Sequence, residues 1–559
     1  AQARSRPPPA QRHQRSGGAR GPMAGDVAND SSEPDVPELE EETFQDHEVE
    51  WDSATRRAVE HPEEERVSKR ALCDADGFPL RHIMDLRCAN RLFICAPRKE
   101  CVRCESDIEL GELHFECPEC GDAVCKECGP GVTIERVYDR VDPSTGVVAA
   151  CDMPSQAFHA RRSFRVRHWK KRTHSGVGQE TYDLAQAVVQ RTSSLCEGLV
   201  TEGSGDTLDH AWDFDLLHDL FGADDRTVAS NFQLLAGGVF KVLETQPILS
   251  EVRVPCKVFG DLHGQARDML LFFRSFGFPG AADDVSFVFN GDFVDRGRHQ
   301  LEVVGIIFAL KLVFPQLVWF NRGNHEDSIM SEKYDFLTQC SALGPEDGQR
   351  TYDAIQKVFN HMPLAALVGS RIFVVHGGIG AGDWSLDDLR RVKRPLSPSM
   401  LRSPEMSWVW QCLWSDPIEE DKNDSNVIGV HPSPARGNRT TTFGWDVTAR
   451  FCAQNELDLI VRSHQFKKCG FGFDVMHDDT LIRVFSARDY VFKTGRPHAS
   501  NDATILHVSR CDVADEDGSA GGTLSVRAQV LPSTTETRGP PVFDEYTGRG
   551  QLECGTCVR

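Results

Sequence analysis

The chain has 559 residues, 40% of them hydrophobic, and a formal net charge of -22. This length predicts two or three folded units with tails, and the acidic balance argues against a general nucleic-acid binder. No run of about 18 apolar residues occurs, so we expect no membrane span. The grouping of the 19 cysteines favours zinc in a reducing compartment over secreted disulfides, which predicts a protein of the cytoplasm, the nucleus or both.

Changes in composition divide the chain into five segments. Residues 1–70 are rich in Arg and Pro and then in Glu and Asp, which predicts a disordered segment. Residues 71–175 hold many Cys and His and predict a zinc-binding module, and residues 176–225 predict a linker. Residues 226–509 have the pattern of an α/β domain, and residues 510–559 predict a flexible tail rich in Asp, Gly, Ser and Pro.

Three Cys-x-x-Cys pairs occur within 28 residues of the predicted zinc module. Four thiolates in a tetrahedral array bind Zn²⁺ and can fold a segment that has little core of its own. Unrelated free cysteines are the alternative, and three pairs with the same Cys-x-x-Cys spacing count against it. The pairs are Cys101 and Cys104, Cys117 and Cys120, and Cys125 and Cys128.

This cysteine region resembles a ZZ-type zinc finger, although residues 129–158 form a long insertion. The resemblance implies one zinc held by four cysteines, a second zinc held by two cysteines and two later histidines, and a peptide or protein partner. The implied ligands are Cys101, Cys104, Cys125 and Cys128 for the first ion, and Cys117, Cys120, His159 and His168 for the second. Either histidine could instead be an ordinary surface residue.

The predicted α/β domain alternates short apolar runs with helix-length amphipathic segments. This alternation predicts βαβ units with mainly parallel strands, and ligands gather beyond the carboxyl ends of such strands. The predicted strands are 258–259, 285–289, 317–320, 372–375 and 457–461, and the predicted helices are 266–276, 300–313 and 350–360.

A polar motif follows each of the five predicted strands. The motifs supply carboxylate, amide and imidazole donors, a mixture that suits Zn²⁺, Fe²⁺ or Mn²⁺ better than Ca²⁺. The carboxylate of Asp292 could bridge two ions about 3.5–4 Å apart, and a water held between them would have a pKa near 7. The candidate ligands are Asp261, His263, Asp292, Asn324, His376 and His464.

Hydrolysis of an ester also needs a proton for the leaving oxygen. His325 follows a candidate ligand and could face the substrate, with Asp295 to orient it. Arg296 and Arg462 offer planar forks that match phosphate oxygens. A single Gly-Asp-x-His-Gly string is more often a capped turn, and Arg462 alone would more often form a surface ion pair. Five motifs in matching strand contexts favour one active site.

From about Asn231 to Val508 the chain resembles the PPP family of metal-dependent Ser/Thr protein phosphatases, a likeness that includes Leu413-Trp414-Ser415-Asp416-Pro417. The resemblance implies a metallophosphoesterase β-sandwich flanked by helices. It also implies an aromatic pocket wall at Tyr490. The string at 323–327 is most similar to the EF-hand branch of the family, but no EF-hand loop is found. The implied ligands are Asp261, His263 and Asp292 for one ion, and Asp292, Asn324, His376 and His464 for the other.

We therefore expect a protein serine/threonine phosphatase that acts on phosphoproteins. A hydroxide bridging two metal ions is expected to attack phosphorus in line, while His325 protonates the leaving oxygen. One alternative is a hydrolase of dinucleoside polyphosphates or other small phosphoesters. Another is a zinc-finger scaffold with vestigial phosphatase activity. Intact candidates for every ligand count against the scaffold.

Overall fold

A computed structural model gives the fold of the second of two units, Ala54–Arg559. Before residue 132 and after residue 533 it describes only short backbone strands. The described residues are 85–88, 99–100, 107–108, 113–116, 123–125, 132–135, 137–142, 147–151, 176–198, 215–281, 285–466, 470–490, 501–510, 524–533, 542–543 and 550–551.

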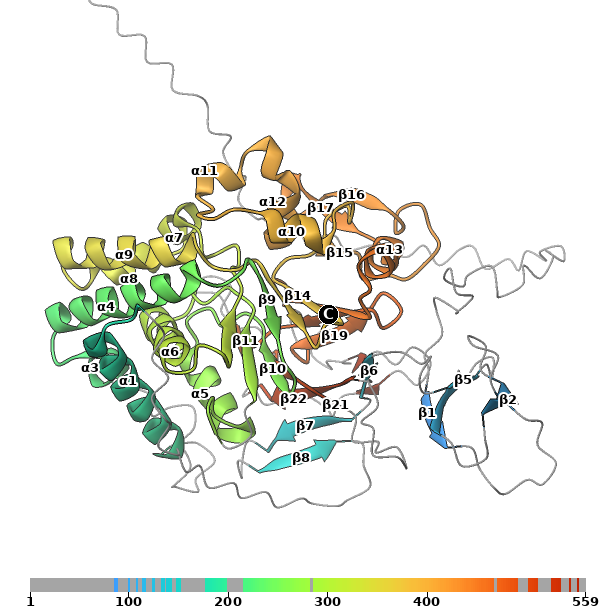
Figure 1. Ribbon diagram of the computed structural model, residues 1–559, viewed down its shortest axis with the longest axis horizontal. Helices are drawn as coiled ribbons and strands as arrows, with labels where there is room; N and C mark the ends of the chain where they lie inside the picture. The colour runs from blue at the N-terminus through green and yellow to red at the C-terminus, as the bar shows by residue number, and fades with distance from the viewer. Residues whose placement is uncertain are drawn as a thin grey trace, which may run out of the picture. The chain divides into compact units, whose positions relative to one another are not determined.

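Two β-sheets form the centre of the catalytic region (Figure 1). The first has the order β12-β11-β10-β21-β22-β7-β8, and β6 also pairs with β22. Its strands are β6 Val132–Ile134, β7 Tyr138–Val141, β8 Val148–Cys151, β10 Cys256–Phe259, β11 Ser286–Phe289, β12 Val318–Phe320, β21 Ala503–Arg510 and β22 Leu524–Leu531. The second has the order β19-β20-β18-β14-β13-β9. Its strands are β9 Leu249–Val252, β13 Ala365–Val368, β14 Ile372–Val375, β18 Leu459–Arg462, β19 Phe473–Met476 and β20 Leu481–Val484.

Successive side chains of a strand point to opposite faces of its sheet. The two sheets pack face to face through the side chains that point inward. Val258 of β10 and Val374 of β14 belong to one apolar cluster between the sheets. Their neighbours face outward, since Phe259 belongs to a cluster with one set of helices and Phe373 to a cluster with another. Both faces of these strands are therefore covered, which explains their nearly continuous apolar sequences.

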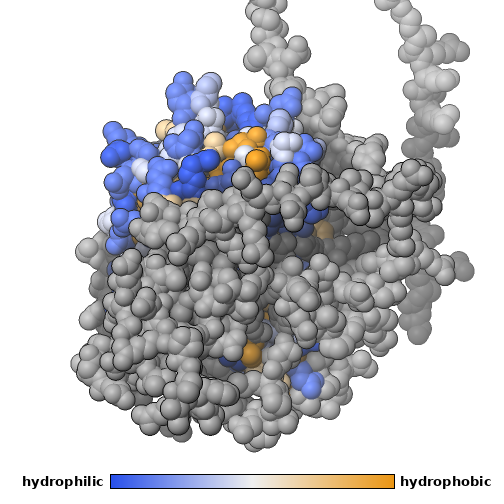
Figure 2. All heavy atoms as spheres, turned by 90° about the vertical axis from the view of Figure 1, so that its right-hand side faces the viewer, coloured by the Kyte–Doolittle hydropathy of each residue, from blue (hydrophilic) through white to orange (hydrophobic). Residues whose placement is uncertain are grey.

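Helices cover the outer face of each sheet (Figure 1). The first sheet is covered by α1 Gln179–Gly198, α3 Leu216–Phe221, α4 Asp225–Glu244, α5 Ala266–Phe276, α6 Gln300–Val313, α8 Phe336–Ser341 and α9 Pro345–Phe359, with α7 Ser328–Lys333 before α8. The second is covered by α10 Leu386–Arg391, α11 Pro398–Leu401, α12 Ser407–Trp414 and α13 Trp445–Asn455. A small sheet of β15 Asp416–Pro417, β16 Val430–Ser433 and β17 Gly437–Phe443 lies beside α12. Figure 2 shows one side of the molecule, where the described residues are largely hydrophilic around a small hydrophobic area.

The predicted fold class, an α/β sandwich flanked by helices, is confirmed. Helices 266–276 and 300–313 have the predicted bounds, and the strand at 372–375 does too. Pairing is parallel where the motifs lie, in β10-β11-β12 and in β14-β18-β20. The other pairs are mixed: β21 runs antiparallel to both β10 and β22 in the centre of the first sheet, whereas β22 pairs in parallel with β6 and β7.

The structure extends the predicted catalytic domain of residues 226–509 at both ends. The predicted linker contains α1 and α3, whose apolar residues pack into the core beside α6. The predicted tail contains β22, which pairs with β21 along its whole length. Part of the predicted zinc module, β6 to β8, joins the same sheet through β22. These segments are needed to cover apolar surface that the predicted domain would leave exposed.

The predicted zinc ligands lie outside the residues whose side chains the structure describes; only the backbone of Cys125 is placed, at the end of β5. The backbone strands near them are β1 Asp85–Cys88, β2 Lys99–Glu100, β3 Asp107–Ile108, β4 Leu113–Glu116 and β5 Ala123–Cys125. Two more, β23 Val542–Phe543 and β24 Gly550–Gln551, pair near the end of the chain. Within the described residues, no helix combines the length and apolarity needed to cross a bilayer.

Gly305 of α6 provides a test of the helical packing. A Cβ atom there would lie 2.4 Å from Cζ of Phe221 and 2.8 Å from Cζ of Phe232. Gly305→Ala should therefore lower the free energy of unfolding, since overpacking costs about 1–3 kcal/mol. Gly237→Ala in α4 is the matched control, because it is exposed and meets nothing within 4 Å. It should gain about 1 kcal/mol of helix propensity. Equal shifts in urea unfolding would contradict this packing.

Candidate active site

The six predicted metal ligands lie together at one edge of the sandwich, although they come from five motifs. Asp261 and His263 follow β10, Asp292 follows β11, and Asn324 follows β12. The other two follow strands of the second sheet, His376 after β14 and His464 after β18. Parallel strands end at the same edge, so the two sheets bring these residues to a shared site.

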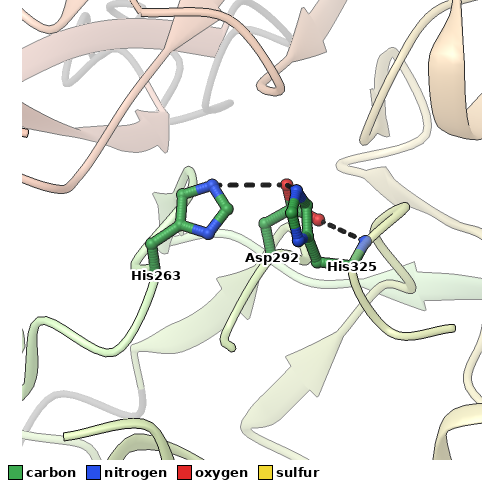
Figure 3. Close-up of side chains that lie close together, drawn as sticks. All are labelled: His263, Asp292 and His325. Atoms are coloured by element: carbon green, nitrogen blue, oxygen red, sulfur yellow. Dashed lines mark hydrogen bonds and ion pairs between the residues drawn. The ribbon is translucent and has the colours of Figure 1, made fainter. Parts of the chain in front are cut away.

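The carboxylate of Asp292 lies at the centre of the site (Figure 3). Its Oδ2 is 3.5 Å from Nε2 of His263 and 4.0 Å from Nε2 of His325. Its Oδ1 is 3.3 Å from Nε2 of His376 and accepts a hydrogen bond of 3.0 Å from the backbone N–H of His325. The two oxygens thus face two different sets of donors, the arrangement expected of a bridging ligand.

The second set of donors surrounds His376. Its Nε2 is 2.9 Å from Oδ1 of Asn324 and 3.2 Å from Nδ1 of His464. Its Nδ1 bonds to the backbone carbonyl of Asn290 at 2.8 Å, and Nδ1 of His263 bonds in the same way to Val294 at 2.9 Å. These carbonyls fix the rings so that the opposite nitrogen faces the site, as is usual for metal-ligating histidines.

The donor set fits a pair of divalent cations. Oδ2 of Asp261 and Nε2 of His464 are buried and have no hydrogen-bond partner among the residues that the structure describes, which is costly unless something else compensates them. Burial, followed by the charge of Asp292, raises the pKa of Asp261 to about 7. Burial, with the charge of Arg436, holds the pKa of His464 well below its usual value, so the ring is neutral and able to act as a ligand.

His325 has the geometry of an oriented acid. Its Nδ1 lies 2.5 Å from Oδ2 of Asp295, so Nε2 is turned toward the carboxylate of Asp292 (Figure 3). Burial alone would lower the pKa of His325, but the negative charges of Asp292 and Asp295 outweigh it, and the pKa is raised. Asp295 is itself held by the backbone N–H of Phe336 at 3.2 Å. A protonated imidazole is therefore favoured at this position.

Two further predicted residues lie beside the donors. Cζ of Arg296 is 4.0 Å from the ring centre of Tyr334, whose ring is 5.3 Å from that of His325. The ring of Tyr490 is buried and lies 5.1 Å from the ring of His263. Both residues thus line the site next to the rings where a substrate would react.

Hydrogen bonds to several loops of the site hold the side chain of Arg462. Its side chain is fully buried and donates to the carbonyls of Gly377 and Ser415, to Gln465 and to Asp416. These bonds connect the loops of the site, and the phosphate contact of Arg462 stays a prediction. Another arginine, Arg436, also lies beside the site: it pairs with Asp416 at 2.6 Å and keeps part of its surface exposed. No sequence motif pointed to it, because it lies in a turn outside the motifs.

Glu326 is a positioning residue to which sequence reasoning assigned no role. Its Oε2 accepts from the backbone N–H groups of Asp292 and Gly323, and its Oε1 accepts from Phe293, each at 2.8 Å. One buried carboxylate therefore joins the loops after β11 and β12. The sequence signal for this role was its position in the string Gly-Asn-His-Glu. An acidic side chain buried next to a metal ligand needs several hydrogen-bond donors to compensate its charge.

Residues with strained backbone conformations are concentrated in the same loops. Five residues of the site have φ values in the left-handed region: 40° at His263, 53° at Asp292, 68° at Asp295, 75° at Arg296 and 71° at His464. Non-glycine residues adopt this region only where the surrounding contacts impose it. The strain is consistent with a site whose geometry is fixed before any ligand binds.

Comparison with known proteins agrees with this geometry. Residues 254–467 match the family model described as calcineurin-like phosphoesterase. The serine/threonine-protein phosphatase BSL2 of Arabidopsis thaliana is 36% identical over 275 residues, which cover 48% of this chain and 25% of the relative. PP1-delta of Caenorhabditis elegans is 36% identical over 250 residues, which cover 44% of this chain and 75% of the relative. A solved Saccharomyces cerevisiae phosphatase with similarity to human PP5 is 28% identical, covers 56% of this chain and 91% of its own, and has a TM-score of 0.46.

The family model places residues 254–467 among the calcineurin-like phosphoesterases. The chain belongs to the PPP family of serine/threonine-protein phosphatases. Members of this family carry divalent metal ions in the active site. The match is partial for several relatives, since the chain spans 25% of BSL2 and 36% of the Drosophila melanogaster phosphatase rdgC. Neither an EF-hand branch nor a zinc finger emerges from the comparisons.

Replacing Glu326 by Gln tests its positioning role. The amide cannot accept from all three backbone N–H groups, so the loops that present Asp292 and Asn324 should loosen. Affinity for Mn²⁺, measured by competition with a chelator, should fall about 10–100-fold, as for other partners that orient ligands. Glu332→Gln, on the exposed side of nearby α7, is the control and should leave the affinity unchanged. Equal affinities for the two variants would remove this role.

Proposed function

We propose that this chain is a protein serine/threonine phosphatase that hydrolyses phosphoserine and phosphothreonine. The observation that carries the proposal is the pair of donor sets around Asp292 with the oriented His325 beside them. The family to which the chain belongs supports the reaction class. A water molecule would displace the serine or threonine oxygen in line, with no covalent intermediate on the enzyme.

Six side chains would hold two cations. Asp292 would serve both, with Asp261 and His263 on one side and Asn324, His376 and His464 on the other. When bound, the cations would neutralise phosphate charge and make a water molecule more acidic, and manganese, iron and zinc all suit these donors. The buried carbonyl partners of the histidines keep each ligand nitrogen aimed at the site.

His325 would act as the general acid. Asp295 accepts from Nδ1 and holds the ring, which leaves the proton on Nε2 for the departing oxygen. Arg296 would bind phosphate oxygens, and its place over Tyr334 limits its motion. Arg462 would be the second phosphate-binding arginine, and Arg436, whose partly exposed side chain lies near His464, would add positive charge beside it. Tyr490 would form a wall of the pocket.

His325→Asn tests the general acid. Turnover of a phosphoserine peptide should fall about 10²–10⁴-fold, because an alkoxide leaves poorly without a proton. Turnover of p-nitrophenyl phosphate should fall much less, because its leaving group needs no proton. Metal content should stay at the wild-type level, since Asn replaces no proposed ligand. Equal losses with both substrates, or an unchanged phosphopeptide rate, would remove His325 from this role.

Substrate class can be tested directly on the full chain. With Mn²⁺, Fe²⁺ or Zn²⁺ supplied, we expect turnover of phosphoserine peptides with kcat/KM well above that for diadenosine tetraphosphate. The half-buried Trp414 beside His464 supports this expectation, since it offers a surface for a peptide next to the reacting phosphate. A preference for the dinucleotide would favour a hydrolase of small phosphoesters, and no turnover of either would favour a scaffold.

The remaining assignments rest on the sequence. We propose a zinc-binding module within residues 71–175, held by the eight ligands named above, with a peptide or protein partner. The three Cys-x-x-Cys pairs support it. Such thiolates persist in a reducing compartment, which supports the cytoplasm or nucleus as the location.

A further inference from the structure

Two tryptophans of α12 form a platform next to the candidate metal site. The ring of Trp414 lies 5.6 Å from that of His464, edge to face. The ring of Trp410 stacks on Trp414 at 5.1 Å with an interplanar angle of 12°. The two residues are four positions apart, on one face of the helix. Both rings are half-buried, so each keeps part of its surface open to solvent.

A positive charge without an acidic partner lies over the outer ring. Cζ of Arg439, on β17, is 5.6 Å from the centre of Trp410. Arg439 is exposed, and its guanidinium forms no ion pair with any residue that the structure describes. Arg402 contacts the same ring at 5.2 Å, but Asp327 binds it through both oxygens at 3.0 and 3.2 Å. Arg439 is therefore the cation left available to a ligand.

Hydrogen bonds fix the platform to the hairpin that carries Arg439. Nε1 of Trp410 donates to Oγ1 of Thr440 at 3.2 Å. Gln411 donates to the carbonyl of Arg439 at 2.8 Å and accepts from the backbone N–H of Thr441 at 3.0 Å. An arginine held against a tryptophan loses little freedom when an anion binds, which favours recognition at this point.

We propose that Trp410 and Arg439 form a subsite for an acidic side chain of the substrate, a few residues from the phosphorylated one. The path from His464 over Trp414 and Trp410 to Arg439 has steps of 5.6, 5.1 and 5.6 Å. An extended peptide advances about 3.3 Å per residue, so it covers the path within about five residues. The subsite rests on the proposed function, and its anion is a carboxylate or a second phosphate.

The test uses sets of phosphoserine peptides that differ at one position, two to five residues from the phosphoserine on either side. That position carries Glu, Lys, Ala or a second phosphoserine. At low salt, wild type should prefer Glu to Lys at the favoured position by about two- to five-fold in kcat/KM, the range of an exposed ion pair. Arg439→Glu should reverse the ratio. Arg226→Glu, on the exposed first turn of α4, is the control and should keep it.

The outcomes separate this inference from the proposed function. The ratio is taken within each variant, so a loss of active enzyme does not affect it. If every peptide is hydrolysed and Arg439→Glu leaves the ratio unchanged, the subsite is wrong and the phosphatase stands. If wild type hydrolyses none, the proposed function fails. A preference for phosphoserine over Glu identifies phosphate as the preferred anion, and equal rates identify a carboxylate as sufficient. Raising the salt should weaken either preference.

Discussion

The site depends on burying the carboxylate of Asp292 at the end of β11. Its backbone adopts a φ of 53°, its N–H is held by Glu326, and its two oxygens face different histidines. The close approach of two loops makes this arrangement possible. A Cβ at Gly291 would lie 2.4 Å from the backbone nitrogen of Gly323, and a Cβ at Gly323 would lie 2.2 Å from Oδ1 of Asp292. Glycine is therefore required at both positions.

The sequence predicted those parts of the molecule that local patterns determine. Helices 266–276 and 300–313 could be read from their apolar spacing, and the strands before the ligand motifs could be read from short β-branched runs. The order of strands and helices then placed Asp261, Asp292 and His464 at one edge, because parallel strands share their carboxyl end. The order and direction of the strands were therefore enough to predict that the candidate metal ligands lie together, without any knowledge of side-chain contacts.

What the sequence left open depends on contacts between distant residues. β22 has a clear alternation of apolar and polar residues, but its place in the sheet depends on β7, roughly 390 residues earlier in the chain. The burial of Arg462 also depends on residues distant in the sequence, since its side chain is held by the carbonyls of Gly377 and Ser415.

Asp416 connects the candidate metal site to the hairpin of β16 and β17. Its Oδ1 binds the buried Arg462 at 2.8 Å, and its Oδ2 binds the partly exposed Arg436 at 2.6 Å. Arg462 in turn lies two residues before His464 and donates to the carbonyl beside His376. A shift of the hairpin would thus be resisted by the loops that present two metal ligands. Because ion pairs of this kind are costly to break when buried, the proposed subsite on α12 and β17 would be held at a fixed distance from the candidate metal ligands.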